Sequence, residues 1–180
     1  MPLAFLPNLL SLFRLIGAFA LLCSITSPWA LFLVFSLISA SDFFDGWAAR
    51  RFGGVSTVGR LLDPLADKCL AGCTYCLLWK LGMAPLWLAL LIIARDVGIV
   101  CGVLYLWTRR ALRSPTGSMV SPILLSKVNT FFQFLYAWLA LGAHVGLWAF
   151  PFEYGTCVVA LFTIASGISY LEILYRWPYE

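Results

Sequence analysis

Four aspartates within a short stretch of the chain have the types and spacing needed for metal-assisted chemistry. Asp42 and Asp45 are three residues apart and Asp63 and Asp67 are four apart, so each pair shares one face of a helix. Four ionised carboxylates in an apolar setting repel one another unless they are protonated or neutralised. A divalent cation such as Mg²⁺ removes that repulsion, and a pair of such ions is typical of phosphoryl transfer.

Small residues and an arginine accompany the aspartates. Gly46 and Ala49 follow the first pair at helical spacing and leave a shallow surface where a phosphate or nucleotide can approach the backbone. Arg50 offers a planar fork of donors to phosphate. Gly59 lets the chain bend or approach a ligand before the next apolar segment. We therefore expect a phosphate or nucleotide site beside the carboxylates.

A rival interpretation uses the same acids without catalysis. Carboxylates inside a membrane also serve as proton or ion carriers in transporters, and Gly and Ala on a helix often only pack. A relay of this kind does not require Gly46, Ala49 and Gly59 at fixed offsets from the acids. The complete pattern therefore favours an enzyme over a non-enzymatic ion or proton transporter.

The whole stretch resembles a known signature. It fixes eight residues over 26 positions, in the order Asp42-x2-Asp45-Gly46-x2-Ala49-Arg50-x8-Gly59-x3-Asp63-x3-Asp67. This pattern is similar, without departure, to the signature of the CDP-alcohol phosphatidyltransferase family. The resemblance implies a membrane enzyme of six helices, generally a homodimer. Such enzymes move a phosphatidyl group from CDP-diacylglycerol to an alcohol and release CMP.

The resemblance also implies roles for individual residues. Asp42, Asp45 and Asp63 would be ligands of two divalent ions, Mg²⁺ or Mn²⁺. Asp67 would be the general base and would also lie close to the ions; a base must reach the attacking hydroxyl within hydrogen-bonding distance. The residues that would shape the CDP site are Gly46, Ala49, Arg50 and Gly59.

Composition indicates how these residues are positioned. The chain has 180 residues, of which 62% are hydrophobic and 11% charged, against roughly 25% charged in a typical soluble domain. We predict an all-α integral membrane protein, with residues 1–180 forming a single domain. A span needs about 20 mainly apolar residues. Six transmembrane helices forming one bundle are predicted near 9–27, 29–51, 61–82, from after Pro85 to 109–110, from after Pro122 to about 150, and 154–176.

The distribution of Lys and Arg predicts the orientation. The loop between the second and third spans, the loop between the fourth and fifth spans and the C-terminal tail hold most of these residues. Positive residues favour the cytoplasmic side. Both termini and the aspartates are therefore predicted to face the cytoplasm or matrix, in a bacterial or organellar inner membrane. Lys and Arg form no long run or stripe, so we expect no nucleic-acid partner.

Polar residues outside the signature are candidates for substrate contacts. Asn8 and Arg14 share a helix face with Ser11, and the family resemblance implies that this face meets the nucleotide or the active-site cavity. We assign Asn8 to CDP binding and Arg14 to the acceptor; a helix start with a snorkelling arginine is the alternative. Arg95 and Lys127 are assigned to the acceptor phosphate. Internal pairing of Arg95, for example with a carboxylate of the site, is a compatible alternative.

The signature identifies the donor and leaves the acceptor open. The segments "ARDV" and "SKVNT" resemble CMP-forming cardiolipin synthases of the eukaryotic type, which use phosphatidylglycerol. Phosphatidylglycerophosphate synthases, which use glycerol 3-phosphate, more often show "ARE" followed by further basic residues, and the fourth span here lacks these. An acceptor with a free phosphate monoester should need more cationic donors. We therefore predict phosphatidylglycerol, with glycerol 3-phosphate as the alternative and serine or inositol derivatives behind it.

Overall fold

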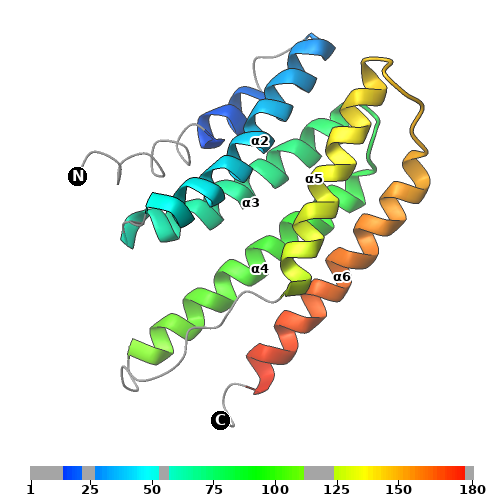
Figure 1. Ribbon diagram of the computed structural model, residues 1–180. Coiled ribbons are helices and arrows are strands. Elements are labelled where there is room, and N and C mark those ends of the chain that lie inside the picture. Colours follow the sequence, from blue (N-terminus) through cyan, green and yellow to red (C-terminus); the bar gives the residue numbers. More distant parts are fainter. Residues whose placement is uncertain (1–13, 22–26, 53–56, 112–123, 177–180) are drawn as a thin grey trace.

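Every element in the described part of the chain is a helix. A computed structural model describes residues 14–21, 27–52, 57–111 and 124–176. Residues 14–21 form a helical segment, and five long helices follow it (Figure 1). These are α2 (Pro28–Phe52), α3 (Thr57–Lys80), α4 (Leu86–Ala111), α5 (Leu124–His144) and α6 (Phe152–Arg176). The all-α prediction is confirmed for these residues.

The helices form one bundle in which α5 is central. It packs against α2, α3 and α6, while α4 packs against α3 and α6. Figure 1 shows α2 and α3 running antiparallel. Aliphatic and aromatic side chains fill the space between the helices, among them Phe35, Leu78, Leu88, Ile92 and Leu141. The core therefore fixes the helices on which the aspartates and the other candidate site residues lie.

Large apolar side chains also cover the outside of the bundle. Exposed examples lie on all five long helices and in segment 14–21, and they include Leu37, Leu90, Phe131, Leu161 and Leu171. Apolar surface of this extent marks contact with lipid or with another protein. Among the described residues, one helical stretch, Phe152–Glu172, is long and apolar enough to cross a membrane, and Pro28–Ser41 is a shorter apolar stretch.

The α3–α4 connection and the α5–α6 connection lie at one end of the bundle, opposite the end of α2 and the start of α3 (Figure 1). We call residues 81–85 and 145–151 the turn end. Each of these two turns contains a glycine with positive φ, 73° at Gly82 and 81° at Gly146, and a residue with a side chain adopts this conformation only with strain. The prediction that the fifth span continues to about residue 150 is wrong. The helix ends at His144, because the chain turns at Gly146.

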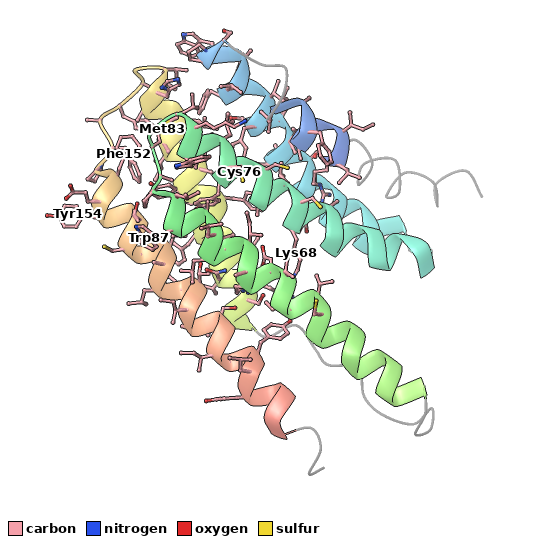
Figure 2. The ribbon with its side chains drawn as sticks, turned by 180° about the vertical axis from the view of Figure 1, so that it is seen from behind. Lys68, Cys76, Met83, Trp87, Phe152 and Tyr154 are labelled. Atoms are coloured by element: carbon pink, nitrogen blue, oxygen red, sulfur yellow. The ribbon has the colours of Figure 1, made fainter. Side chains whose placement is uncertain are left out.

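A cavity of about 460 Å³ opens at the turn end. Its lining comes from the α3–α4 turn and the start of α6 and includes Met83, Phe152 and Thr156. Figure 2 shows Met83 and Phe152 at this end, while Lys68 lies farther along α3. This cavity is therefore separate from the region of the aspartates.

Candidate active site

The α2–α3 hairpin brings the two aspartate pairs to matching heights. Asp42 lies ten residues before the end of α2 at Phe52, and Asp67 lies ten residues after the start of α3 at Thr57. At a rise of about 1.5 Å per residue, both are about 15 Å from the helix ends that the connection joins. By the same measure Asp45 and Asp63 are each about 10 Å away. Two antiparallel helices thus carry four acids at two shared levels.

The other residues of the signature lie on the same hairpin. Gly46, Ala49 and Arg50 are in the last turns of α2, and Gly59 is in the first turn of α3. Asn8 lies outside the described residues. Of the four aspartates, Asp67 is the one whose side chain the structure describes. The local geometry of the site is therefore built from Asp67 outward.

Asp67 forms an ion pair with Arg14. The Arg14 guanidinium donates through Nη1 to Oδ1 of Asp67. The arginine side chain is 2% exposed and the aspartate 33% exposed, so one partner is enclosed and the other reaches the surface of the bundle. A buried guanidinium needs a compensating carboxylate. The sequence placed both residues at the site but did not predict that they pair.

Segment 14–21, which carries Arg14, also packs closely against α2. A Cβ added at Gly17 would lie 2.5 Å from Cδ1 of Ile38, so a larger residue requires Ile38 to shift. Ala18 and Leu21 are buried in the same interface. Small residues let two helices approach closely. Gly17 thereby helps to hold Arg14 within reach of α3.

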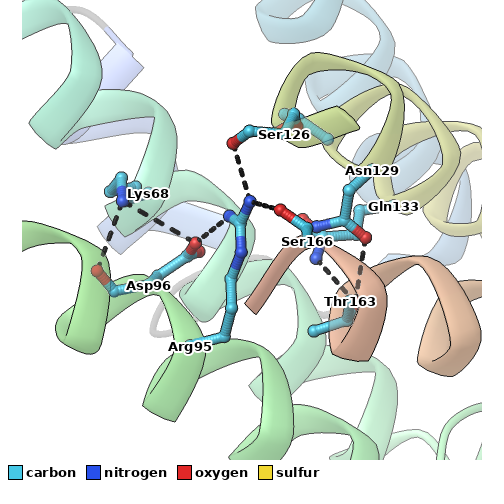
Figure 3. A network of polar contacts seen from close by, with 9 residues as sticks. Lys68, Arg95, Asp96, Ser126, Asn129, Gln133, Thr163 and Ser166 are labelled. Carbon is cyan, nitrogen blue, oxygen red and sulfur yellow. Dashed lines mark hydrogen bonds and ion pairs between the residues drawn. The ribbon is translucent and has the colours of Figure 1, made fainter. Parts of the chain in front are cut away.

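Arg95 is enclosed in a polar network between α4, α5 and α6 (Figure 3). Its Nη1 donates to Oδ1 of Asp96 at 2.6 Å, and its Nη2 donates to the hydroxyls of Ser126, at 2.7 Å, and Ser166. The side chain is 6% exposed. Internal pairing, the alternative interpretation of Arg95, is therefore present, and the described carboxylate partner is Asp96, not an aspartate of the signature.

Lys68 connects α3 to the same network. Its Nζ donates to the backbone oxygen of Asp96 at 3.2 Å and lies 3.8 Å from Oδ1 of that residue (Figure 3). Lys68 directly follows Asp67 in α3. Lys127, in contrast, is exposed at the start of α5, and no contact between Lys127 and Arg95 is found in the described part of the chain.

A chain of neutral side chains extends the network along α5 and α6. Gln133 donates to the Thr163 hydroxyl at 3.2 Å, and Thr163 donates to the Asn129 side-chain oxygen at 3.0 Å. All three are buried. Sequence reasoning missed Gln133 and Thr163. The available signal was spacing, since Gln133 lies one turn after Asn129 and Thr163 three residues before Ser166, within otherwise apolar helices.

Comparison with known proteins identifies the family. The family model for CDP-alcohol phosphatidyltransferase matches residues 4–166, which include the helical segment, the hairpin and the whole polar network. The chain belongs to the CDP-alcohol phosphatidyltransferase family. It therefore has the activity of an enzyme of this family, whose members are membrane proteins, and the transporter interpretation is set aside.

The relatives of this phosphatidyltransferase fall into two groups. A CDP-diacylglycerol–glycerol-3-phosphate 3-phosphatidyltransferase of Rickettsia bellii is 34% identical and covers 96% of each chain. A protein of the same name from Bacillus subtilis is 33% identical over 78% of this chain and 70% of its own. A human CMP-forming cardiolipin synthase is 33% identical over 76% of this chain and 50% of its own. Enzymes named for glycerol 3-phosphate and enzymes named as cardiolipin synthases are thus both represented among similar proteins.

Proposed function

We propose that this enzyme transfers the phosphatidyl group of CDP-diacylglycerol to phosphatidylglycerol, forming cardiolipin and CMP. The observation that carries the proposal is the α2–α3 hairpin, which holds the complete eight-residue signature with the acids at two shared levels. In this reaction a hydroxyl oxygen of the acceptor bonds to the phosphatidyl phosphorus. The bond from that phosphorus to the CMP oxygen breaks, and CMP leaves.

Two divalent ions, Mg²⁺ or Mn²⁺, fit the donor set of the hairpin. Asp42, Asp45, Asp63 and Asp67 supply the hard carboxylate oxygens that such ions prefer. When bound, the ions supply positive charge beside the pyrophosphate and the leaving CMP. Arg14 stabilises the ionised form of Asp67, which is the form required of a carboxylate that has a second task besides coordination.

That second task is to accept a proton. Asp67 takes the proton of the acceptor hydroxyl while the hydroxyl oxygen attacks the phosphorus. The side chain of Asp67 is partly exposed, so the acceptor can reach it. Arg14 holds Asp67 in one orientation. Asn8, Gly46, Ala49, Arg50 and Gly59 contact or shape the CDP moiety.

The proposed membrane arrangement has six spans, with segment 14–21 inside the first. The exposed apolar side chains on the helices support contact with lipid. The aspartates then lie toward the cytoplasm or matrix, on the side where Lys and Arg are concentrated, in a bacterial or organellar inner membrane. We propose a homodimer as the working form.

The hydrogen bonds of Arg95 support phosphatidylglycerol as the acceptor. Asp96, Ser126 and Ser166 already occupy its terminal nitrogens, so this cation has little capacity left for a phosphate monoester. Glycerol 3-phosphate is the second candidate. It is favoured by the relative from Rickettsia bellii, because that match covers nearly the whole of both chains.

An acceptor panel tests the proposal. The purified protein in detergent is supplied with CDP-diacylglycerol and Mg²⁺ or Mn²⁺, together with phosphatidylglycerol, glycerol 3-phosphate, serine or inositol phosphate. CMP release is measured, and the lipid product is identified by mass spectrometry. We expect cardiolipin, and we expect EDTA to abolish its formation. Phosphatidylglycerophosphate as the main product overturns the acceptor, and turnover in EDTA overturns the metal dependence.

A further inference from the structure

The cavity at the turn end is not used by the proposed reaction. Its volume of about 460 Å³ lies within the range of small-molecule sites, about 300–1,000 Å³. Its walls are residues 82–85 of the α3–α4 turn and four residues at the start of α6, namely Phe152, Glu153, Thr156 and Cys157. Apolar residues supply most of this lining. The cavity can therefore hold the apolar part of a ligand next to a few polar groups.

The cavity lies beside side chains that are typical of a membrane–water boundary. Trp87, at the start of α4, is 53% exposed, and Tyr154, at the start of α6, is 76% exposed. Figure 2 shows both at the same end of the bundle as Met83 and Phe152, which line the cavity. Trp and Tyr gather where lipid headgroups meet the hydrocarbon. We therefore expect a ligand of this cavity to come from the headgroup region of the bilayer.

Glu153 gives the cavity its charge. Of the lining residues in the described part of the chain, it is the charged one, and it is exposed. A carboxylate beside an apolar wall attracts a cation more strongly than it would in bulk water, because part of its surroundings has a low dielectric constant. The same charge repels an anionic headgroup such as that of phosphatidylglycerol. The ligand that fits this cavity therefore carries a positive group.

The Thr156 hydroxyl has acceptor capacity left for a ligand. The Tyr136 hydroxyl donates its one proton to the Met83 backbone oxygen at 2.7 Å, so Thr156 is the donor in its hydrogen bond of 3.1 Å with Tyr136. The Thr156 proton is thus committed inside the bundle, while the oxygen keeps lone pairs that can accept. Thr156 is 7% exposed and lines the cavity. It adds a second acceptor to the carboxylate of Glu153.

The backbone of the α3–α4 turn offers the cavity no donor. The amides of Met83 and Ala84 both donate to one backbone oxygen of α3, at 2.9 and 3.2 Å, and the amide of Gly82 also donates to α3. Pro85 has no amide hydrogen. This wall can therefore accept hydrogen bonds but not donate them. It suits a primary ammonium, which donates hydrogen bonds and accepts none, better than a quaternary ammonium, which has no proton to donate.

The start of α6 supplies the complementary kind of group. The first amides of a helix have no partner within the helix, and Phe152 and Glu153 are the first two residues of α6 and line the cavity. Such amides suit a phosphate oxygen. A headgroup in which a short link joins a phosphate to a primary ammonium therefore finds a complement for both of its charges at this cavity.

We propose that the turn-end cavity binds a phospholipid whose headgroup ends in a primary ammonium, such as phosphatidylethanolamine, at the membrane surface opposite the aspartates. Glu153 and Thr156 accept hydrogen bonds from the ammonium, and the apolar wall around Met83 and Phe152 contacts the glycerol and the first acyl carbons. This lipid is neither donor nor acceptor in the proposed reaction. The inference therefore goes beyond that reaction and does not depend on which alcohol the enzyme uses.

Cys157 can report whether the cavity is occupied, because it lines the cavity and its thiol is free and exposed. Cys101 of α4 is a free and exposed thiol outside the cavity and serves as an internal control. The purified protein is placed in nanodiscs of phosphatidylcholine with or without phosphatidylethanolamine and treated with a maleimide, and peptide mass spectrometry measures alkylation of both thiols. Phosphatidylethanolamine at about ten times its dissociation constant should slow alkylation of Cys157 by about tenfold. Alkylation of Cys101 should not change.

The variant Glu153→Gln tests the charge, because it keeps the size of an exposed side chain and removes its carboxylate. In this variant, phosphatidylethanolamine should slow alkylation of Cys157 by no more than about twofold. Glu172→Gln, which removes an exposed acid near the other end of α6, is the matched control and should keep the full protection. Thr156→Val removes the second acceptor and should lose part of the protection.

Three results would overturn the inference. The first is equal alkylation of Cys157 with and without phosphatidylethanolamine. The second is full protection in Glu153→Gln, which would show that apolar contact or a change in the bilayer is sufficient. The third is equal protection by phosphatidylglycerol, which the carboxylate should repel. No substrate is present in these measurements, so an error in the proposed acceptor does not affect them.

Discussion

The two ends of the bundle hold their helices together by different means. At the end that contains the aspartates, the described contacts include ion pairs, between Arg14 and Asp67 and among Lys68, Arg95 and Asp96. At the turn end they are neutral. The Tyr136 hydroxyl donates to the Met83 backbone oxygen at 2.7 Å, and Trp148 donates to the Leu139 backbone oxygen at 2.8 Å. Aromatic rings pack around these bonds.

This contrast indicates that the end with the aspartates carries the chemistry and that the turn end stabilises the fold. Charges in an apolar environment stabilise a fold weakly, because desolvation offsets their attraction, yet they are what a phosphate ester and a metal ion recognise. Neutral hydrogen bonds and packed rings carry a much smaller desolvation cost than charges do. We therefore expect substitutions near the aspartates to reduce activity and substitutions at the turn end to reduce stability.

The largest effect is expected at the proposed base. Asp67→Asn should lower kcat by about 10²- to 10⁴-fold, because the acceptor hydroxyl loses its proton acceptor and the proposed ions lose one carboxylate. The melting temperature in detergent should also fall, because the buried Arg14 loses this carboxylate, so turnover is compared per folded molecule. CMP release and thermal unfolding are measured on the same sample, with Glu172→Gln as control. Turnover equal to that of the unmodified enzyme would rule out Asp67 as the base.

The second-largest effect on activity is expected when Asp67 loses its arginine partner. Arg14→Gln removes the cation that orients Asp67, and a misplaced catalytic group costs about 100-fold in kcat. Arg14→Lys keeps the charge and should recover part of the loss. The KM for CDP-diacylglycerol should stay nearly constant in both variants, which distinguishes positioning from donor binding. An equal loss of kcat in the Lys and Gln variants would contradict the role of this ion pair.

At the turn end, Gly142→Ala should act on stability. Its Cβ would lie 2.0 Å from the Trp148 ring, so the ring must move and its bond to Leu139 is strained. Overpacking of this kind costs about 1–3 kcal/mol. Thermal unfolding should show a lower midpoint, with activity per folded molecule unchanged. Gly98→Ala, where the added Cβ meets nothing within 4 Å, is the matched control. A loss of kcat in Gly142→Ala without a loss of stability would contradict the expectation that the turn end affects stability alone.

The smallest effect is expected at Gly82. An added Cβ meets no atom within 4 Å, so the cost of Gly82→Ala comes from φ of 73° alone. That conformation costs a residue with a side chain about 1 kcal/mol. Gly82→Asn should cost less, since asparagine tolerates this region better. Equal unfolding midpoints for the Ala and Asn variants would show that the turn relaxes.

Sequence alone located the helices well where composition changes sharply. The second span was predicted at 29–51 and the helix is Pro28–Phe52; the sixth was predicted at 154–176 and the helix is Phe152–Arg176. The fifth was overextended, because residues 145–150 are as apolar as the helix and the break depends on the φ of Gly146. Apolar content does not report backbone conformation.

The candidate site was predictable in its residue types and less so in its pairings. Spacing placed Asp67 and Arg14 at the site, and the hairpin geometry follows from a short connection between two helices. That Arg14 meets Asp67, and that Arg95 meets Asp96 and two serines, depends on how five helical elements pack. Periodicity within one helix carries no information about the neighbour that a face meets. Lys68 was overlooked for that reason.

Consecutive residues of α3 turn to different neighbours, Asp67 to the helical segment 14–21 and Lys68 to α4. A rigid helix cannot rotate about its axis without moving both side chains. Any rotation of α3 that changes the contact of Asp67 therefore changes that of Lys68 as well. The position of the proposed base is then coupled to the contact between α3 and α4 through the helix that carries both residues.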